Sequence, residues 1–492
     1  MKLISSRWGA LDSLVAGCLI ACFGLISADA AERPRYGGVL RVEMRERVNS
    51  MDPRSTGLSE ADGYANERLL ELVFERLVRL DDTGKPAPGL ATSWEHDASQ
   101  THWQFQIRPG VKFHDGTSLT PALVAAAMKE DMSGTWQVSA SDRGIAIELP
   151  YPQPGLLVDL ATRDLFIFHR AQDTVFGTGP FRIAEWQAQK RLVLVASEDY
   201  WAGRPFIDRL EISLGVAPQQ QLVDLELGRA EVVEVLPNLT RRASQSAVRV
   251  EASAPVELYS LMVTPRGAKS YDSQFSKALS LAIDRAAIVN VLLQRQGEPA
   301  GSLLPQWLSG YAFLFPTAPN LEQAKKIRTL FSSSPLLALD YDGSDPMAAT
   351  LAQRIAVDAR QAGIVMSVSA APATDGPNHA DVHLVGRHFT APDADQALQA
   401  FLVDVVTEQA AGDHAGEART QGAMIALDTP ERRYAAERDA IDGGRIIPIV
   451  FVPEIYALGP SVRDWMPPRW GGWRLEDVWL DAAPHAAATG GG

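Results

Sequence analysis

Hydrophobic and polar residues follow two different periods along the chain, one typical of strands and one typical of helices. Residues 103–107 alternate apolar and polar side chains, which predicts a half-buried strand. Residues 65–80 repeat leucine and valine at helical spacing, so we expect one amphipathic helix there. A second helix is predicted at Leu119–Met128, where Thr120 is placed to cap the first turn and Pro121 falls within it.

The rest of the chain alternates the same two patterns. Strands are predicted at 37–43, 192–196, 210–214, 336–340, 364–370 and 445–453, and helices at 276–293, 346–362 and 430–442. This order of strand, helix and strand predicts a mixed α/β fold. Because Pro448 and Pro453 interrupt and end the last strand, we expect that strand to lie at a sheet edge or at a hinge.

The N-terminal residues 1–30 are predicted to be a signal peptide. Lys2 and Arg7 supply a positive start, and an apolar stretch at residues 14–27 follows that is too short to span a bilayer comfortably. Ala28-Asp29-Ala30 then provides a small-x-small cleavage site. We therefore expect the chain to be exported to the periplasm.

Both cysteines of the chain, Cys18 and Cys22, fall within this predicted signal peptide. The mature protein would then contain no thiol, which excludes thiol catalysis, cysteine zinc sites and a disulfide framework. Each cysteine also ends a short stretch that resembles a lipoprotein box, so a lipid anchor at Cys22 or Cys18 is the alternative to a free periplasmic form. Apolar sequence continues past Cys22, and we therefore favour cleavage after Ala30.

Composition and charge narrow the class of protein. The chain has 492 residues, 46% of them hydrophobic and 22% charged, as is usual for globular proteins, and this length predicts two or three domains or lobes. A formal net charge of −14 and the absence of a basic run disfavour a nucleic acid partner. No sequence motif typical of nucleotide binding, serine hydrolysis or zinc hydrolysis occurs, so binding is expected rather than catalysis.

Five short segments resemble the motifs of one protein family and occur in that family's order. They are Glu71–Trp94, which ends in Pro-Gly-Leu-Ala-Thr-Ser-Trp; Trp103–Gly116, which ends in Val-Lys-Phe-His-Asp-Gly; Gly177–Phe181; Ser197–Trp201, with Ser197 in place of an asparagine; and Ala278–Arg285. From about Gly37 to Leu480 the chain resembles the family 5 extracellular solute-binding proteins. These are the periplasmic receptors of oligopeptide, dipeptide and nickel ABC importers.

The resemblance implies an α/β, bilobal periplasmic-binding-protein fold with an extra small domain. The implied division is lobe I at 31–65, 172–250 and 445–481, a shortened inserted domain at 66–171, lobe II at 251–444, and a disordered tail at 482–492. Hinge strands are expected near 248–261 and 445–450.

The resemblance also implies a function. Two lobes would close around a peptide-like solute, and the closed form would dock on an ABC permease with its ATPase subunits. A monomer without a cofactor is expected. The alternative is a lobe repurposed for another solute, either an anionic compound or a metal chelate, or for signalling.

The segment that starts at Arg387 resembles the family's ligand-binding motif, in which an aspartate anchors the α-ammonium of a peptide. Aligned on Asp393, that aspartate is replaced by Thr390, and Arg387 stands in place of a tryptophan. Threonine lacks the charge to pair with an ammonium, whereas Arg387 favours an anionic group. His388 and Phe389 complete this group of ligand-binding candidates, and a solvated loop is the alternative interpretation.

Three further candidates come from other loops. Arg54 lies in a segment that resembles a cleft-lining loop of the family, with an exposed loop arginine as the alternative. Trp307 and Tyr311 follow Pro305 and are candidates for an aromatic wall, with packing under a loop as the alternative.

A metal site is the weakest of the hypotheses. His379, Asp381 and His383 occupy alternate positions, so on a strand they would share one face and could ligate a metal. Isolated histidines are more often surface or core residues, and no metal is therefore the leading prediction.

Overall fold

The computed structural model describes most of the chain outside its two ends. The described residues are 33–54, 60–131, 136–162, 165–172, 174–246, 249–264, 273–331, 336–371, 380–389, 392–410, 427, 429–467 and 472–481. The described residues from Tyr36 onward form one compact unit, which contains all the helices and strands named below. The predicted signal peptide, both cysteines, the predicted tail, His379 and Thr390 lie outside the described residues.

A mixed sheet organises this unit. Within the described residues it has eleven strands: β1 (Val39–Glu43), β10 (Phe181–Gln187), β11 (Arg191–Ala196), β12 (Arg209–Ser213), β13 (Val232–Glu234), β14 (Arg249–Val263), β15 (Glu298–Pro299), β16 (Leu337–Asp342), β17 (Met366–Ala371), β18 (Val382–His388) and β19 (Ile446–Leu458). Their order is β10-β11-β12-β1-β13-β19-β14-β18-β16-β17, and β15 pairs with β19 off this path. The predicted α/β class is confirmed.

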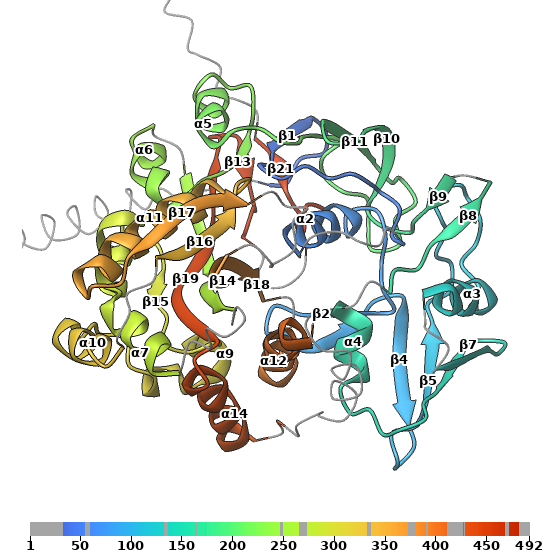
Figure 1. Ribbon diagram of the computed structural model, residues 1–492. Helices are drawn as coiled ribbons and strands as arrows, with labels where there is room; N and C mark the ends of the chain where they lie inside the picture. Colours follow the sequence, from blue (N-terminus) through green and yellow to red (C-terminus); the bar gives the residue numbers. More distant parts are fainter. Residues whose placement is uncertain are drawn as a thin grey trace, which may run out of the picture. The chain divides into compact units, whose positions relative to one another are not determined.

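The long strands β14 and β19 run antiparallel in the middle of the sheet and join its two halves (Figure 1). The sequence prediction of a strand interrupted by prolines is confirmed, but its expected place at an edge is wrong. Pro453 lies opposite Pro255, at a register irregularity, and Pro448 lies opposite Ser260, beside another. An interior strand tolerates these prolines because the ladder is already interrupted where they stand.

Helices cover the sheet on both faces. The described helices are α2 (Glu60–Leu70), α3 (Pro121–Asp131), α4 (Leu156–Thr162), α5 (Pro218–Glu226), α6 (Thr240–Gln245), α7 (Ser273–Ala282), α8 (Arg285–Ala287), α9 (Gln306–Ser309), α10 (Leu321–Arg328), α11 (Pro346–Gln361), α12 (Ala394–Ala410) and α14 (Pro430–Asp442). Alternate residues of β14 enter different cores: Leu261 packs with α7 and α11, whereas Leu258 and Met262 pack with α12. The period of two along the strand therefore places one hydrophobic core on each face.

Smaller sheets complete the unit. One has the order β4 (Ala91–His96), β5 (His102–Ile107), β7 (Gly144–Glu148) and β6 (Gln137–Ala140), and the two-stranded sheets are β2 (Val78–Leu80) with β3 (Pro86–Pro88), β8 (His169–Ala171) with β9 (Thr174–Phe176), and β20 (Val462–Arg463) with β21 (Trp479–Leu480). The alternation predicted at 103–107 is confirmed, because Trp103, Phe105 and Ile107 are the buried residues of β5. Thr120 also caps α3 as predicted, through a 3.3 Å hydrogen bond from the Leu123 amide to its hydroxyl.

Two predicted helices are wrong in their extent. The helix predicted at 65–80 ends at Leu70, because the amides of Gly179 and Phe181 donate to the carbonyls of Val73 and Leu72. A distant segment therefore takes the hydrogen bonds that would continue the helix.

The helix predicted at 276–293 stops at Ala282, and Asp284 caps a new turn by accepting from the Ala287 amide at 2.9 Å. The chain turns here because the buried Arg285 side chain donates to the carbonyls of Pro448 and Ser280, each at 2.9 Å.

Candidate functional site

Charged and aromatic side chains gather where β1, β13, β14, β18, β19 and helix α2 meet in the middle of the sheet. We call this group the junction cluster; its members are Arg45, Glu46, Tyr64, Arg68, Glu234, Glu257, His388 and Glu454. Strand ends position several of them: Arg45 and Glu46 closely follow β1, Glu234 ends β13, and His388 ends β18 opposite Glu257. The fold thus brings together charges that are far apart in the sequence.

Arg68 is the buried centre of the cluster. Its guanidinium pairs with Glu234 at 3.1 Å and with Glu454, and its side chain is 5% exposed. The guanidinium also lies over the Tyr64 ring, 4.8 Å from its centroid, and over Trp473, 5.1 Å from its centroid. Two carboxylates and two aromatic faces therefore hold one buried cation in place.

Glu234 is shared between two arginines. Its carboxylate accepts from the Arg45 backbone amide at 2.8 Å as well as from Arg68. The Arg45 guanidinium in turn pairs with Glu46 at 3.1 Å. Burial raises the pKa of Glu234 to about 7, and the nearby Glu46 adds to that rise.

Glu257 and His388 face each other at the edge of the cluster. The His388 Nε2 atom lies 3.9 Å from a Glu257 oxygen and 3.9 Å from a Glu454 oxygen, and its ring stacks on Tyr64 with centroids 4.0 Å apart. Burial lowers the pKa of His388 to about 4, so the imidazole is neutral at pH 7. Burial, together with Asp345, raises the pKa of Glu257 to about 8.

Among the described residues, Glu257 forms no close ion pair with a charged group, although Arg45 attracts its carboxylate from further away. Within the described residues its one ion-pair contact is the neutral His388, and its side chain keeps 16% exposure. The cluster as a whole contains four glutamates and two arginines. Because the pKa values of Glu234 and Glu257 are raised to about 7 and about 8, both carboxyl groups are partly protonated at neutral pH, and a ligand group that carries positive charge or donates hydrogen bonds would favour their ionised form.

The other residues proposed from the Arg387 segment lie away from these charges. The Arg387 guanidinium lies 5.7 Å from the centroid of Phe401 on α12, and Phe389 is buried between Phe401 and Phe451. Asp393 accepts from the Asp395 amide at 3.0 Å and so stands at the start of α12. Of this group, His388 alone among the described residues belongs to the junction cluster.

Arg54, Trp307 and Tyr311 are not brought together with the junction cluster. Arg54 lies 5.2 Å from the centroid of the Phe168 ring. Trp307 donates to the Pro255 carbonyl at 2.9 Å and is 37% exposed. Tyr311 is buried and makes an edge contact with Tyr434, with centroids 5.8 Å apart, which is the packing expected under a loop.

One buried carboxylate, that of Glu437 on α14, anchors the segment that leads into the loop carrying Tyr311. Glu437 is fully buried and accepts from the amides of Leu303 and Leu304, and burial raises its pKa to about 7. We expect Glu437→Ala to lower the free energy of unfolding by about 2–4 kcal/mol, because two buried amides lose their acceptor. Urea denaturation followed by circular dichroism measures this loss.

Asp439→Ala is the matched control for Glu437, since it removes a carboxylate from an exposed position of the same helix. We expect the control to change the free energy of unfolding by less than about 0.5 kcal/mol. Equal losses in both variants would contradict the role given to Glu437.

The residues of the hypothetical metal site have other partners. The His383 Nδ1 atom lies 2.5 Å from an Asp340 oxygen, and Asp381 accepts from the Ala338 amide at 2.9 Å. Among the described residues, no group of three or more histidines, cysteines, aspartates or glutamates is arranged to hold a metal ion. His379, the third residue of the pattern, lies outside the described residues.

Sequence reasoning missed most of the junction cluster. Glu234 and Glu454 each interrupt or end an otherwise apolar strand, and Glu257 lies within the mainly apolar second half of β14; a charge at such a position needs a partner once the strand is buried. That pattern was the available signal. It does not reveal which charges meet, because the residues lie in separate segments of the chain.

Comparisons with known proteins agree with this architecture. The family model of bacterial extracellular solute-binding proteins, family 5 Middle, matches residues 85–407. The chain is 22% identical to the nickel-binding protein NikA of Staphylococcus aureus over 360 residues, which is 69% of this chain and 71% of that protein. It is also 23% identical to the probable D,D-dipeptide-binding periplasmic protein DdpA of Escherichia coli over 270 residues, 48% of this chain and about half, 52%, of that relative.

A solved structure extends the likeness to nearly the whole fold. The periplasmic binding protein DppA of Helicobacter pylori, in complex with the peptide STSA, superposes with a TM-score of 0.75 at 17% identity, covering 91% of this chain and 99% of that one. At this level of identity the likeness concerns the fold. In the part of the chain that the structure describes, no helix has the length and apolar character needed to cross a membrane.

Proposed function

The chain belongs to the family 5 bacterial extracellular solute-binding proteins, and on that premise we propose that it captures a small, peptide-like solute for an ABC importer. In this proposal the protein works in the periplasm, binds without catalysis, and delivers its solute to permease subunits driven by ATPase subunits. A relative named as a D,D-dipeptide-binding protein and a structural relative in complex with a peptide support the peptide-like solute.

One observation supports the junction cluster as the binding site. Its members come from both halves of the main sheet, with Arg45 and Glu234 on one side of β19 and Glu257 and His388 on the other. A solute held by groups from both halves interacts with all of them only when the halves are close together. Differential affinity for that closed arrangement would drive closure, and closure would exclude water from the contacts.

The charges of the junction cluster favour some solutes over others. Glu257 and the excess of glutamates complement an ammonium or other positive group, whereas Arg387, proposed from sequence for an anionic group, lies against Phe401. An anionic solute is therefore disfavoured. A positively charged metal chelate is the second candidate, because the same carboxylates suit it and one relative is named for nickel binding.

The first test identifies the solute and the residue that holds it. We expect native mass spectrometry of the protein, purified without unfolding, to detect a bound small molecule that is released on gentle denaturation. Glu257→Gln should retain about tenfold less of it, since glutamine cannot become the carboxylate that a bound cationic group would stabilise at this position. The variant should fold, because the raised pKa of Glu257 means that a neutral side chain is tolerated there.

Glu251→Gln provides the matched control on the same strand, since Glu251 is 39% exposed and pairs with Arg249 on the surface. A released peptide supports the proposal, and a released chelate supports the second candidate. A protein that stays empty, and whose melting temperature does not change with dipeptides, tripeptides or nickel–histidine, contradicts both.

A further inference from the structure

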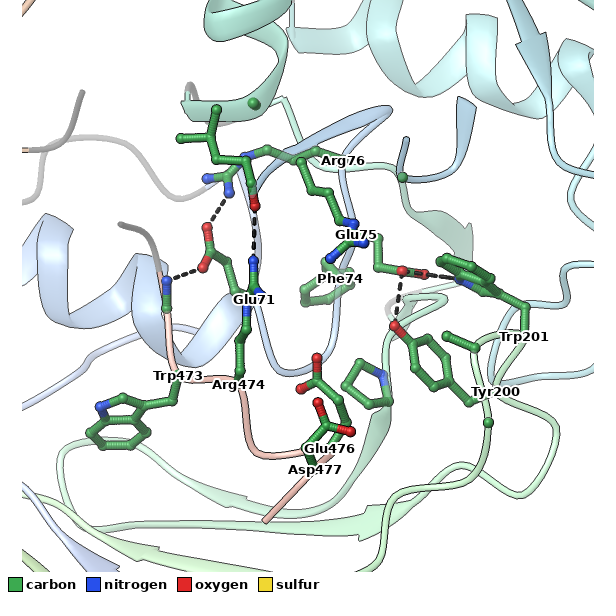
Figure 2. Close-up of a pocket in the computed structure, with 18 of the residues that line it drawn as sticks. Glu71, Phe74, Glu75, Arg76, Tyr200, Trp201, Trp473, Arg474, Glu476 and Asp477 are labelled. Atoms are coloured by element: carbon green, nitrogen blue, oxygen red, sulfur yellow. Dashed lines mark hydrogen bonds and ion pairs between the residues drawn. The ribbon is translucent and has the colours of Figure 1, made fainter. Parts of the chain in front are cut away.

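A cavity lies beside the C-terminal end of helix α2. This cavity of about 510 Å³ is walled by the residues that follow α2, by the loop at 200–206 and by the segment at 472–477 (Figure 2). Tyr64 and Arg68 of α2 belong to the junction cluster, whereas Glu67 of the same helix lines the cavity. The two sites therefore use different faces of one helix, and the cavity is large enough for a small organic molecule.

The lining of this cavity is rich in charge but unevenly paired. Five acidic residues and four arginines line it: Glu67, Glu71, Glu75, Glu476, Asp477, Arg76, Arg79, Arg204 and Arg474. Arg204 and Arg474 pair with acidic residues that do not line the cavity, Arg76 pairs with both Glu67 and Glu71, and Arg79 donates to the Pro88 carbonyl. Negative charge is consequently left over inside the cavity.

Glu75 contributes part of the negative charge of the cavity, and three neutral side chains already donate hydrogen bonds to its carboxylate. Its carboxylate accepts from the Thr178 hydroxyl at 2.7 Å, from the Tyr200 hydroxyl at 3.2 Å and from the Trp201 indole at 3.0 Å. Burial raises its pKa to about 7, and the charge of Glu476 contributes to the rise. These three hydrogen bonds tie the cavity wall together, so Glu75 serves mainly as a structural group.

Of the two acidic residues that remain, Asp477 is exposed, whereas Glu476 is half-buried and is not held by neutral side chains as Glu75 is. Its own backbone amide donates to the carboxylate, but within the described residues no other side chain donates a hydrogen bond to it and no cation forms an ion pair with it. Arg474 and Arg79 act on it only at longer range, and burial raises its pKa. Figure 2 shows Glu476 beside the same space as Phe74 and Tyr200.

We propose that this cavity binds a monovalent organic cation, whose guanidinium or primary ammonium group pairs with the carboxylate of Glu476. Such a group would supply the missing charge and donate the hydrogen bonds that the carboxylate lacks. The rings of Phe74 and Tyr200 would contact the cation or its alkyl chain, as aromatic residues do in other cation sites. This site is separate from the junction cluster and goes beyond the proposed import of a solute.

Isothermal titration calorimetry with butylguanidinium chloride tests the charge requirement, with butylurea as a neutral probe of nearly the same shape. We expect binding of the cation, no binding of butylurea, and at least a tenfold loss of cation affinity in Glu476→Gln. The affinity of the unchanged protein should rise with pH, because deprotonated Glu476 is the binding form and its pKa is raised. Glu476→Gln should reduce that pH dependence, and the part that remains reports Glu75, whose pKa is about 7 in the same cavity.

Two control variants locate the cation. Glu322→Gln removes a charge from an 88% exposed residue of α10, and Glu257→Gln removes one from the junction cluster. Unchanged affinity in both supports the cavity. The proposal is overturned if butylurea binds equally well, if Glu476→Gln binds like the unchanged protein, or if Glu257→Gln alone weakens binding. The test is independent of the imported solute, so it can fail while the proposed function holds.

The cation can come from a free solute or from a side chain of a partner protein. A capped Gly-Arg-Gly peptide, titrated in the same way, separates these sources. Peptide binding that depends on Glu476 shows that the cavity admits an arginine carried on a chain. Binding of butylguanidinium without binding of the peptide restricts the site to free small cations, and both results support the proposed chemistry.

Discussion

Gly177→Ala is expected to lower the free energy of unfolding by more than about 4 kcal/mol, because no space exists for the added methyl group. A Cβ at this position would lie 1.9 Å from the Val73 carbonyl oxygen, 2.7 Å from its carbon and 2.8 Å from a ring atom of Phe74. Two of these three atoms belong to backbone. The backbone of this turn is itself engaged, since the His114 amide donates to the Gly177 carbonyl at 3.0 Å.

Thermal and urea denaturation measure this loss, and Gly63→Ala is the matched control. A Cβ at Gly63 meets nothing within 4 Å, and Gly63 lies inside helix α2. Alanine favours a helix over glycine by about 1 kcal/mol, so we expect the control to be neutral or more stable. If Gly177→Ala stays within about 1 kcal/mol of the unchanged protein, the contact with Val73 relaxes easily and the argument is wrong.

The contact between the segment at 177–181 and the residues after helix α2 also explains why the end of that helix was not predicted from the sequence. Hydrophobic period alone identified the strands near 192–196, 210–214 and 364–370, because each pattern is satisfied by burial of its own segment. The end of helix α2 depends instead on the segment at 177–181, which takes the carbonyls of Leu72 and Val73. No local pattern near residue 70 contains that information.

The candidate site likewise contains one residue that the sequence indicated and several that it did not. His388 was found through its neighbours in the sequence, as part of a family-like motif. Its structural partners Tyr64, Glu257 and Glu454 come from three other segments, and the register of β14 against β18 and β19 decides which of them meet. A charged residue within an apolar strand signals that a partner exists, but the topology of the sheet identifies that partner.

Arg68→Met is expected to lower the free energy of unfolding by about 3–5 kcal/mol, the range found when one member of a buried ion pair is removed. The methionine fills similar volume, but it removes the guanidinium that pairs with Glu454 and leaves Glu234 with Arg45 as its remaining cation. It also removes the guanidinium from the rings of Tyr64 and Trp473. The exposed pair of Arg438 and Asp442 offers a contrast, and Arg438→Met should cost less than about 0.5 kcal/mol.

The pH dependence of the Arg68→Met variant separates lost charge from lost packing. Without Arg68 the pKa of Glu234 should rise further in the folded protein, so the folded state binds more protons than the unfolded state. Stability of the variant relative to the unchanged protein should therefore recover as pH falls from 7 toward 5. Adding Glu454→Gln to Arg68→Met should recover part of the loss at pH 7, as a double-mutant cycle measured by urea denaturation would reveal. A loss that is independent of pH and unchanged by the second substitution would assign the role of Arg68 to packing between Tyr64 and Trp473 instead of to charge.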